Sequence, residues 1–392
     1  MPKMPVMPSQ SAIAAFYPRI APPAFAVYLI ACLQMRSFFD PWLLVGWTAL
    51  ALGFIAAPKS TGHRKTLAAL AGLLAAHAVA IPGAIIWGSG NWVLTAGVLI
   101  WMAPSMALYI ADNTDRVLAW LIPAWLAHAG LIIWGGFFQW ALDSRGHILN
   151  HGIPTGLANN ANLAAGFLDL GIVYALISNR PWMAPPLIMA LLFTGSRWGI
   201  AVAGAVIILM VITRTISWRP VMWAALTLIG AVWLIGAATP AAYTIAGYDS
   251  LASIIYTAQA DVGTRLAVPH IPSFLPRGVA EHSGLHNVPL RIAVESGIGG
   301  ALLWVAITAW ALGRRSSDQH GHINQRRNAQ QHPRHHVRHR WLLITLVLLG
   351  ILDYYTWMGH MGGFWWLLIG MVKGGGSSED ERILPSTGPG RL

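Results

Sequence analysis

The chain has 392 residues, of which 56% are hydrophobic and 10% are charged, and its mean hydropathy is +0.56. This composition excludes an ordinary soluble globular domain and predicts an all-α, polytopic membrane protein. The formal charge of +11 does not indicate a nucleic-acid partner, because the basic residues occupy connections between apolar segments, where anionic membrane lipids attract them.

Apolar runs that are bounded by charges and turn residues predict about twelve transmembrane helices. They cover residues 22–35, 41–57, 66–86, 92–110, 117–140, 161–177, 182–195, 197–213, 220–238, 291–312, 341–357 and 360–373. The first, seventh and last are short and contain the helix breakers Pro22–Pro23, Pro185–Pro186 and Gly362–Gly363. We expect residues 1–373 to form a single transmembrane domain, followed by a disordered cytoplasmic tail at 374–392.

The basic residues are distributed unevenly between the two sides of this topology. Of the 25 lysine and arginine residues, nineteen fall in one set of connections. The other set holds six arginines and no lysine, namely Arg36, Arg145, Arg197, Arg265, Arg277 and Arg291. The positive-inside rule therefore predicts that both termini are cytoplasmic and that these six arginines lie on the outer side.

The connection at residues 313–340 is predicted to be cytoplasmic, and it carries six histidines among seven arginines. Histidine tracts can bind metal, but these have no fixed ligand spacing, which favours a solvated, lipid-facing loop. Cys32 is the only cysteine, which excludes an internal disulfide and a cluster of thiolate ligands. We expect no metal and no cofactor.

The longest outer connection, at residues 239–290 between the ninth and tenth predicted helices, is long enough to have structure of its own. Its second half contains Arg265, His282, His286 and Asn287. These side chains can bind anions and transfer protons, so this loop is the main candidate to carry catalytic residues.

The end of this loop and the helix that follows carry a motif. It consists of His286, Asn287, Leu290 and the run 295–300, which reads Glu-Ser-Gly-Ile-Gly-Gly. The motif resembles the signature of the O-antigen ligase and O-antigen polymerase superfamily. Two further elements resemble that family, Thr194–Arg197 at the start of the eighth helix and Val262–Arg265 in the loop, and the resemblance covers roughly residues 150 to 373.

The resemblance implies twelve helices with cytoplasmic termini and a large periplasmic loop between the ninth and tenth. It further implies a C-type glycosyltransferase of the bacterial inner membrane. The donor would be a glycan on undecaprenyl diphosphate, and the active site would face the periplasm.

The residue types suit this chemistry. Negative charge grows on the phosphate oxygen when a sugar leaves a lipid diphosphate, and fixed guanidinium groups stabilise that charge. We expect Arg197 and Arg265 to bind the diphosphate and His286 to take the proton of the attacking hydroxyl, with inversion at the sugar carbon. The outer segments contain no Asp-x-Asp motif, so we expect a metal-independent reaction.

Five more residues are candidates for substrate binding: Arg291, Asn287, His282, Trp198 and Asn162. Arg291 either binds a phosphate or marks the membrane interface, and His282 is the rival base. Asn162, with Asn159 and Asn160, either contacts sugar hydroxyls or caps the sixth helix. Glu295 lies one turn into the tenth helix, and an ionisable group there implies a partner.

These residues leave four functions open, one of which is oligosaccharyl transfer to a protein. The leading hypothesis is an O-antigen ligase that transfers the glycan to the lipid A core. A polymerase of O-antigen or exopolysaccharide would use the same donor chemistry with a glycan acceptor. A lipid-glycan transporter or flippase could also have twelve helices, but it would place charges near the midplane rather than at one face.

Overall fold

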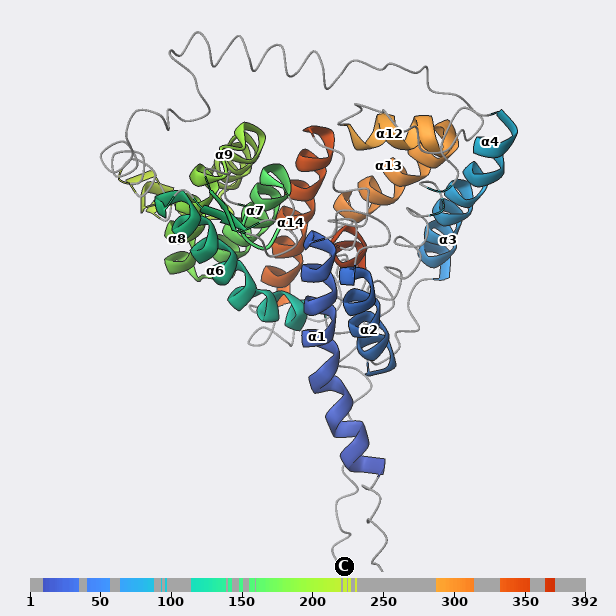
Figure 1. The fold of residues 1–392 in the computed structure, drawn as a ribbon, viewed down its shortest axis with the longest axis horizontal. Coiled ribbons are helices and arrows are strands. Elements are labelled where there is room, and N and C mark those ends of the chain that lie inside the picture. Colours follow the sequence, from blue (N-terminus) through green and yellow to red (C-terminus); the bar gives the residue numbers. More distant parts are fainter. Residues whose placement is uncertain are drawn as a thin grey trace, which may run out of the picture.

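The computed structural model describes somewhat more than half of the chain. The described residues are 10–34, 41–56, 64–87, 93, 96, 114–138, 140–142, 148–150, 155–158, 160–219, 221–223, 225–226, 230, 287–313, 332–352 and 364–370. Within them the protein is almost entirely helical, which confirms the all-α prediction (Figure 1).

The α-helices in chain order are α1 (Gln10–Gln34), α2 (Pro41–Ala56), α3 (Arg64–Ala78), α4 (Ala80–Trp87), α6 (Thr114–Phe138), α7 (Ala161–Ile177), α8 (Ala184–Phe193), α9 (Arg197–Ile212), α12 (Val288–Glu295), α13 (Gly297–Gly313) and α14 (His332–Leu352). A 3₁₀ turn, η1 (Pro181–Met183), precedes α8, and residues 364–370 are also helical. The strands β1 (Trp140–Leu142) and β2 (Ile148–Asn150) form a small antiparallel hairpin that the sequence did not predict.

Several predicted helices agree closely with the observed ones, and α7 and α9 match the predictions 161–177 and 197–213 within a residue. Others differ for identifiable reasons. Pro185 and Pro186 start α8 instead of interrupting a helix, because the first turn of a helix needs no donor at these positions. The predicted helix 291–312 is two helices, α12 and α13, which meet at Ser296.

The helix α14 begins at His332, so part of the connection predicted at 313–340 is helical. The helix α1 extends back to Gln10, well before the predicted start at Pro22. Most of the predicted helices 92–110 and 220–238, and nearly all of the predicted loop 239–290, lie outside the described residues.

By length and composition, one helix in the described part of the chain, Arg116–Gly136, is able to cross a membrane. Eight shorter apolar helices of 10–17 residues accompany it. Large apolar side chains are exposed on several of these helices, among them Leu44, Ile55, Ile86, Ile212 and Leu302.

The helices pack around α7 and α14. The helix α7 contacts α6, α8, α9 and α14, while α14 also contacts α12 and α13, and α13 packs on α3. The helices α1 and α2 form a hairpin that packs on α6 through α1. Thus α14 lies between one group of helices that contains α7 and α9 and another that contains α12 and α13 (Figure 1).

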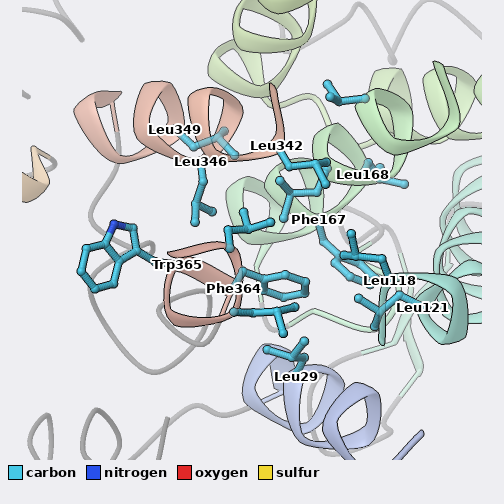
Figure 2. Close-up of a cluster of buried hydrophobic side chains, with 14 of the residues drawn as sticks. Leu29, Leu118, Leu121, Phe167, Leu168, Leu342, Leu346, Leu349, Phe364 and Trp365 are labelled. Atoms are coloured by element: carbon cyan, nitrogen blue, oxygen red, sulfur yellow. The ribbon is translucent and has the colours of Figure 1, made fainter. Parts of the chain in front are cut away.

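A single large hydrophobic core holds these groups together. In Figure 2, Phe364 lies between Phe167 of α7 and Leu29 of α1, and the ring centroids of Phe167 and Phe364 are 5.9 Å apart. Leu346 of α14 and Leu118 of α6 belong to the same cluster. The C-terminal helical residues 364–370 therefore join the first helix to the centre of the bundle.

Candidate functional site at one end of the helix bundle

The start of α7 rests on a buried histidine of α6. The backbone N–H of Leu157 donates to His128 Nδ1 at 2.8 Å, and His128 Nε2 lies 3.2 Å from the carbonyl oxygen of Ala164. Since an N–H can only donate and a carbonyl can only accept, the imidazole carries its proton on Nε2. Gly156 lies against the same ring with φ +57°. His128 thus fixes the loop that leads into α7.

Side chains at the start of α7 also bind the start of α9. Asn160 caps α7 by accepting a hydrogen bond from the N–H of Leu163 at 2.9 Å. Two residues later, Asn162 Oδ1 accepts a hydrogen bond from the hydroxyl of Ser196 at 2.9 Å. That hydroxyl in turn caps α9, because the N–H of Gly199 donates to it at 3.3 Å.

Arg197 and Trp198 are the first two residues of α9, directly after this cap, and both are half-buried. The turn before them is rigid, since the Thr194 hydroxyl donates to the carbonyl of Leu191 at 2.6 Å and accepts from the N–H of Ser196 at 3.2 Å. The backbone that carries Arg197 is therefore held from both α7 and α8.

The start of α12 is fixed in a similar way. Asn287 Oδ1 accepts a hydrogen bond from the N–H of Leu290 at 3.0 Å and caps the helix. Its Nδ2 donates to the carbonyl of Ile351 at 3.0 Å, near the end of α14. One side chain therefore caps α12 and ties it to α14.

These helix starts lie at the same end of the bundle. Trp341 Nε1, half-way along α14, donates to Thr215 Oγ1, just beyond the end of α9, at 3.1 Å. The helices α9 and α14 are in contact, and Figure 1 shows both of them reaching the same end of the bundle as α12, whose Asn287 binds Ile351 near the end of α14. The starts of α7, α9 and α12 are thus neighbours of that end, as Figure 1 shows for α9, α14 and α12.

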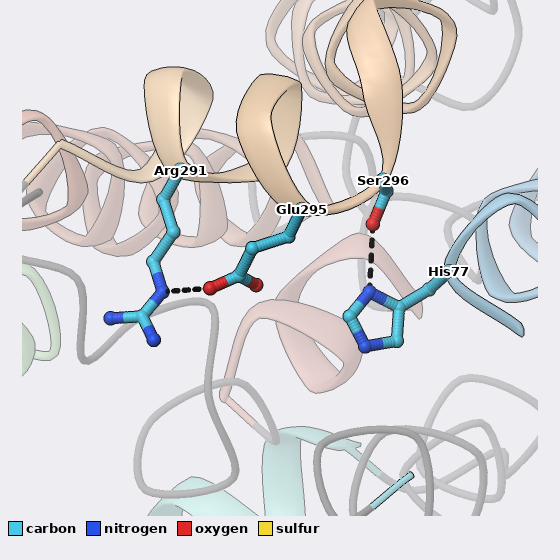
Figure 3. Close-up of polar contacts among 4 residues, drawn as sticks. All are labelled: His77, Arg291, Glu295 and Ser296. Carbon is cyan, nitrogen blue, oxygen red and sulfur yellow. Dashed lines mark hydrogen bonds and ion pairs between the residues drawn. The ribbon is translucent and has the colours of Figure 1, made fainter. Parts of the chain in front are cut away.

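A buried ion pair joins Arg291 in the first turn of α12 to Glu295, the last residue of that helix. Arg291 Nε donates to Glu295 Oε1 at 2.6 Å, and the two side chains are 5% and 0% exposed (Figure 3). Next to it, at the junction of α12 and α13, Ser296 Oγ lies 2.7 Å from Nδ1 of His77 on α3. Gly297 follows with φ +79°, a conformation that glycine adopts without strain and that lets the chain turn between the two helices.

The structure places five of the eight predicted site residues: Asn162, Arg197, Trp198, Asn287 and Arg291. All five belong to the three helix starts at one end of the bundle. The other three, Arg265, His282 and His286, lie outside the described residues.

Two predicted site asparagines have structural roles. Both polar atoms of the Asn287 amide form hydrogen bonds to backbone groups, and Asn162 accepts a hydrogen bond from Ser196. Capping of this helix falls to Asn160, one of the two roles that the sequence left open. The sequence predicted that Glu295 has a partner, and the structure shows that this partner is Arg291.

Sequence reasoning missed His128 and His77. Both are fully buried, and each binds a segment distant in sequence. The sequence does indicate that these two histidines have partners, because a histidine inside an apolar helix needs a hydrogen-bond partner. The sequence could not name the partner, since His77 and Ser296 are 219 residues apart.

The arrangement favours an anion. The N-terminus of a helix carries a partial positive charge, so a cation in the first turn is unfavourable unless an anion is near. Arg197 and Arg291 are both in the first turn of their helices. Glu295 balances the charge of Arg291, so the start of α9 is the place that favours a further anion. No cluster of three or more histidine, cysteine or acidic side chains that could hold a metal is present in the described segments.

Comparison of the sequence with known protein families finds no match, and no curated protein is similar enough to count as a relative. The functional argument therefore depends on the residues and their geometry.

Proposed function

We propose that the protein is a polytopic membrane glycosyltransferase that acts on a lipid-diphosphate donor. It transfers an oligo- or polysaccharide from undecaprenyl diphosphate to an acceptor hydroxyl at the periplasmic face of the bacterial inner membrane. Its preferred acceptor is the lipid A core, which makes it an O-antigen ligase of about twelve transmembrane helices. Both termini are cytoplasmic.

The location in a membrane is supported by the composition and by the surface of the helices. Many large apolar side chains are exposed on the helices, Leu44 and Ile86 among them, as contact with lipid requires. Basic residues are sparse on the predicted outer side, and those present are arginines. Arginine binds phosphate oxygens in pairs, which lysine does not.

The observation that carries the proposal is the position of Arg197 and Arg291. They occupy the first turns of α9 and α12, and both turns lie at the same end of the bundle. Two guanidinium groups next to two positive helix ends form a region suited to a diphosphate. A transporter would instead need such charges near the midplane.

In the proposed reaction the acceptor hydroxyl attacks the anomeric carbon of the donor sugar. His286 takes the hydroxyl proton as the new carbon–oxygen bond forms. The bond between that carbon and the phosphate oxygen breaks with inversion, and its electron pair leaves with undecaprenyl diphosphate. Arg197 and Arg265 stabilise the charge on the departing oxygen, so the reaction needs no metal. His282 and Trp198 contact the sugar or the acceptor, and Asn162 and Asn287 hold the helix starts that carry the site.

Reconstitution tests this function. The purified protein in lipid nanodiscs is mixed with undecaprenyl-diphosphate-linked glycan and lipid A core in the presence of a chelator, and glycosylated lipid A is measured. We expect product with the wild type, and a loss of about a hundredfold or more in Arg197→Ala, Arg265→Ala and His286→Ala. Arg180→Ala is the matched control, because this exposed arginine follows α7 at the opposite end of the bundle.

The products separate the alternatives. Longer glycans on undecaprenyl diphosphate, without transfer to lipid A, would identify a polymerase. Transfer that requires added magnesium would contradict the metal-free reaction. Movement of the lipid-linked glycan across the bilayer with no new glycosidic bond would identify a flippase and overturn the proposal.

A further inference from the structure

Burying the ion pair between Arg291 and Glu295 costs free energy. Both side chains are almost completely enclosed, at 5% and 0% exposed, and the two residues belong to the same helix. Removing two charges from water commonly costs more free energy than their attraction returns. Two apolar side chains of similar volume at these positions would stabilise the fold at least equally. An ion pair in such a place is therefore better explained by what the arginine does than by stability.

The geometry of the pair sets the direction of the guanidinium group. Glu295 Oε1 accepts from Nε, the nitrogen inside the side chain, and the contact is 2.6 Å long. Figure 3 shows that the two terminal nitrogens of Arg291 consequently lie on the far side of the group from Glu295. The terminal nitrogens are the fork that binds phosphate oxygens in pairs.

We propose that Glu295 is a positioning residue of the donor site, which orients the fork of Arg291 toward the diphosphate. This inference rests on the proposed function, since it concerns the same donor. Glu295 acts through Arg291 and touches neither the sugar nor the acceptor. Its charge keeps the guanidinium in one rotamer inside an enclosed, poorly solvated place, where a charge-assisted hydrogen bond to phosphate is strong.

The neighbouring contact provides a matched control. Ser296 is the next residue in the chain and is also buried, at 3% exposed, but it binds His77 on α3 instead of Arg291. Loss of its hydroxyl disturbs the same helix junction without changing the orientation of the arginine. Ser296→Ala is therefore expected to lower stability and to leave diphosphate binding unchanged.

The test compares Glu295→Gln, Arg291→Gln and the double variant in nanodiscs. The measurements are the Kd for undecaprenyl diphosphate, the donor KM and kcat for transfer to lipid A core, and the thermal unfolding midpoint. Loss of a charge-assisted contact predicts that Glu295→Gln raises the Kd and the donor KM about ten- to a hundredfold, with a much smaller change in kcat. The acceptor KM stays constant.

The double variant makes the test independent of folding. Arg291→Gln alone leaves a buried lone carboxylate and is expected to destabilise the protein, whereas the double variant contains two neutral amides of similar size and folds. If Glu295 acts only through Arg291, the double variant binds undecaprenyl diphosphate no more weakly than Arg291→Gln. Additive losses would overturn the positioning role.

The remaining outcomes distinguish the two proposals. Unchanged Kd and donor KM in Glu295→Gln, with transfer intact, would overturn the positioning role and leave the glycosyltransferase standing. A wild type that binds undecaprenyl diphosphate but transfers no glycan, with binding weakened in Glu295→Gln, would retain the positioning role and remove the proposed function. Equal weakening by Ser296→Ala would show a general disturbance of the junction and overturn the positioning role.

Discussion

At the scale of single residues, the polar side chains inside this protein mainly hold helix starts in place. His128, Asn162 and Asn287 each bind a segment that is distant in the chain. A hydrogen bond in a poorly solvated interior has no competition from water, so few such contacts are enough to set the position of a helix end. The residues proposed to bind the donor are attached to these contacts.

The loop at Gly156 gives a prediction at this scale. A Cβ at this position would lie 2.6 Å from His128 Nδ1, and the backbone has φ +57°. We expect Gly156→Ala to lower the free energy of unfolding by about 1–3 kcal/mol. Gly204→Ala, where a Cβ meets no atom within 4 Å in α9, is the control and is expected to be neutral or slightly stabilising. Thermal unfolding in detergent compares the two, and equal midpoints would contradict the fixed role of the His128 contact.

Asn162 allows a second prediction. Asn162→Ala removes the acceptor of the Ser196 hydroxyl, so the first turn of α9 and Arg197 lose a constraint. We expect transfer to fall roughly ten- to a hundredfold, because small displacements of a catalytic group cost rate. Asn160→Ala removes a helix cap at a cost of about 1 kcal/mol and controls for stability. Equal loss of transfer in both variants would show that stability alone matters.

At the scale of elements, the junction between α12 and α13 is the most informative. Glu295, Ser296 and Gly297 are consecutive, and they supply an ion pair, a hydrogen bond to α3 and a positive φ. The run 295–300 is part of the sequence motif that begins at His286. Its physical role is to end one helix and start another at an angle, so that α12 presents Arg291 at the end of the bundle.

Asn287 connects this element to α14 and gives the third prediction. Asn287→Ser keeps an oxygen that can cap α12 but is too short to reach Ile351, so we expect a loss of about 1 kcal/mol. Asn287→Ala loses both contacts, and we expect about 2 kcal/mol. The measurement is the unfolding midpoint. A serine variant as unstable as the alanine variant would mean that the contact with α14, and not the cap, dominates.

At the scale of the whole molecule, the proposal requires that the helix starts face the periplasm. The ends of α7 provide markers, since Asn162 at its start is tied to the turn before Arg197 while Arg180 follows its end. Cys32 is buried and is the only cysteine, so its replacement by alanine provides a background for labelling.

The fourth prediction uses that background. In intact cells or oriented vesicles, Arg197→Cys is expected to react with a membrane-impermeant maleimide from the periplasmic side. Arg180→Cys is expected to react only after the cytoplasmic side is opened. The reverse pattern would contradict the orientation predicted from the basic residues. It would also remove a periplasmic donor site.

Composition and local pattern predicted an all-helical chain and the bounds of some of its helices. A long apolar run predicts a helix because a helix forms all of its backbone hydrogen bonds within the segment. The predicted bounds of α7 and α9 were correct within a residue. The sequence also indicated that Glu295 needs a partner and that an asparagine caps α7. These are local properties that depend on neighbours a few residues away.

Only the tertiary structure decided which segments meet. The contacts of His77 with Ser296, of Asn162 with Ser196 and of Asn287 with Ile351 span large separations in the chain, and no local pattern encodes them. The sequence by itself determined an apolar, helical chain with arginines on one predicted side. The packing of α7, α9, α12 and α14 brought Arg197 and Arg291 to one end, because long-range contacts depend on how complete helices fit together.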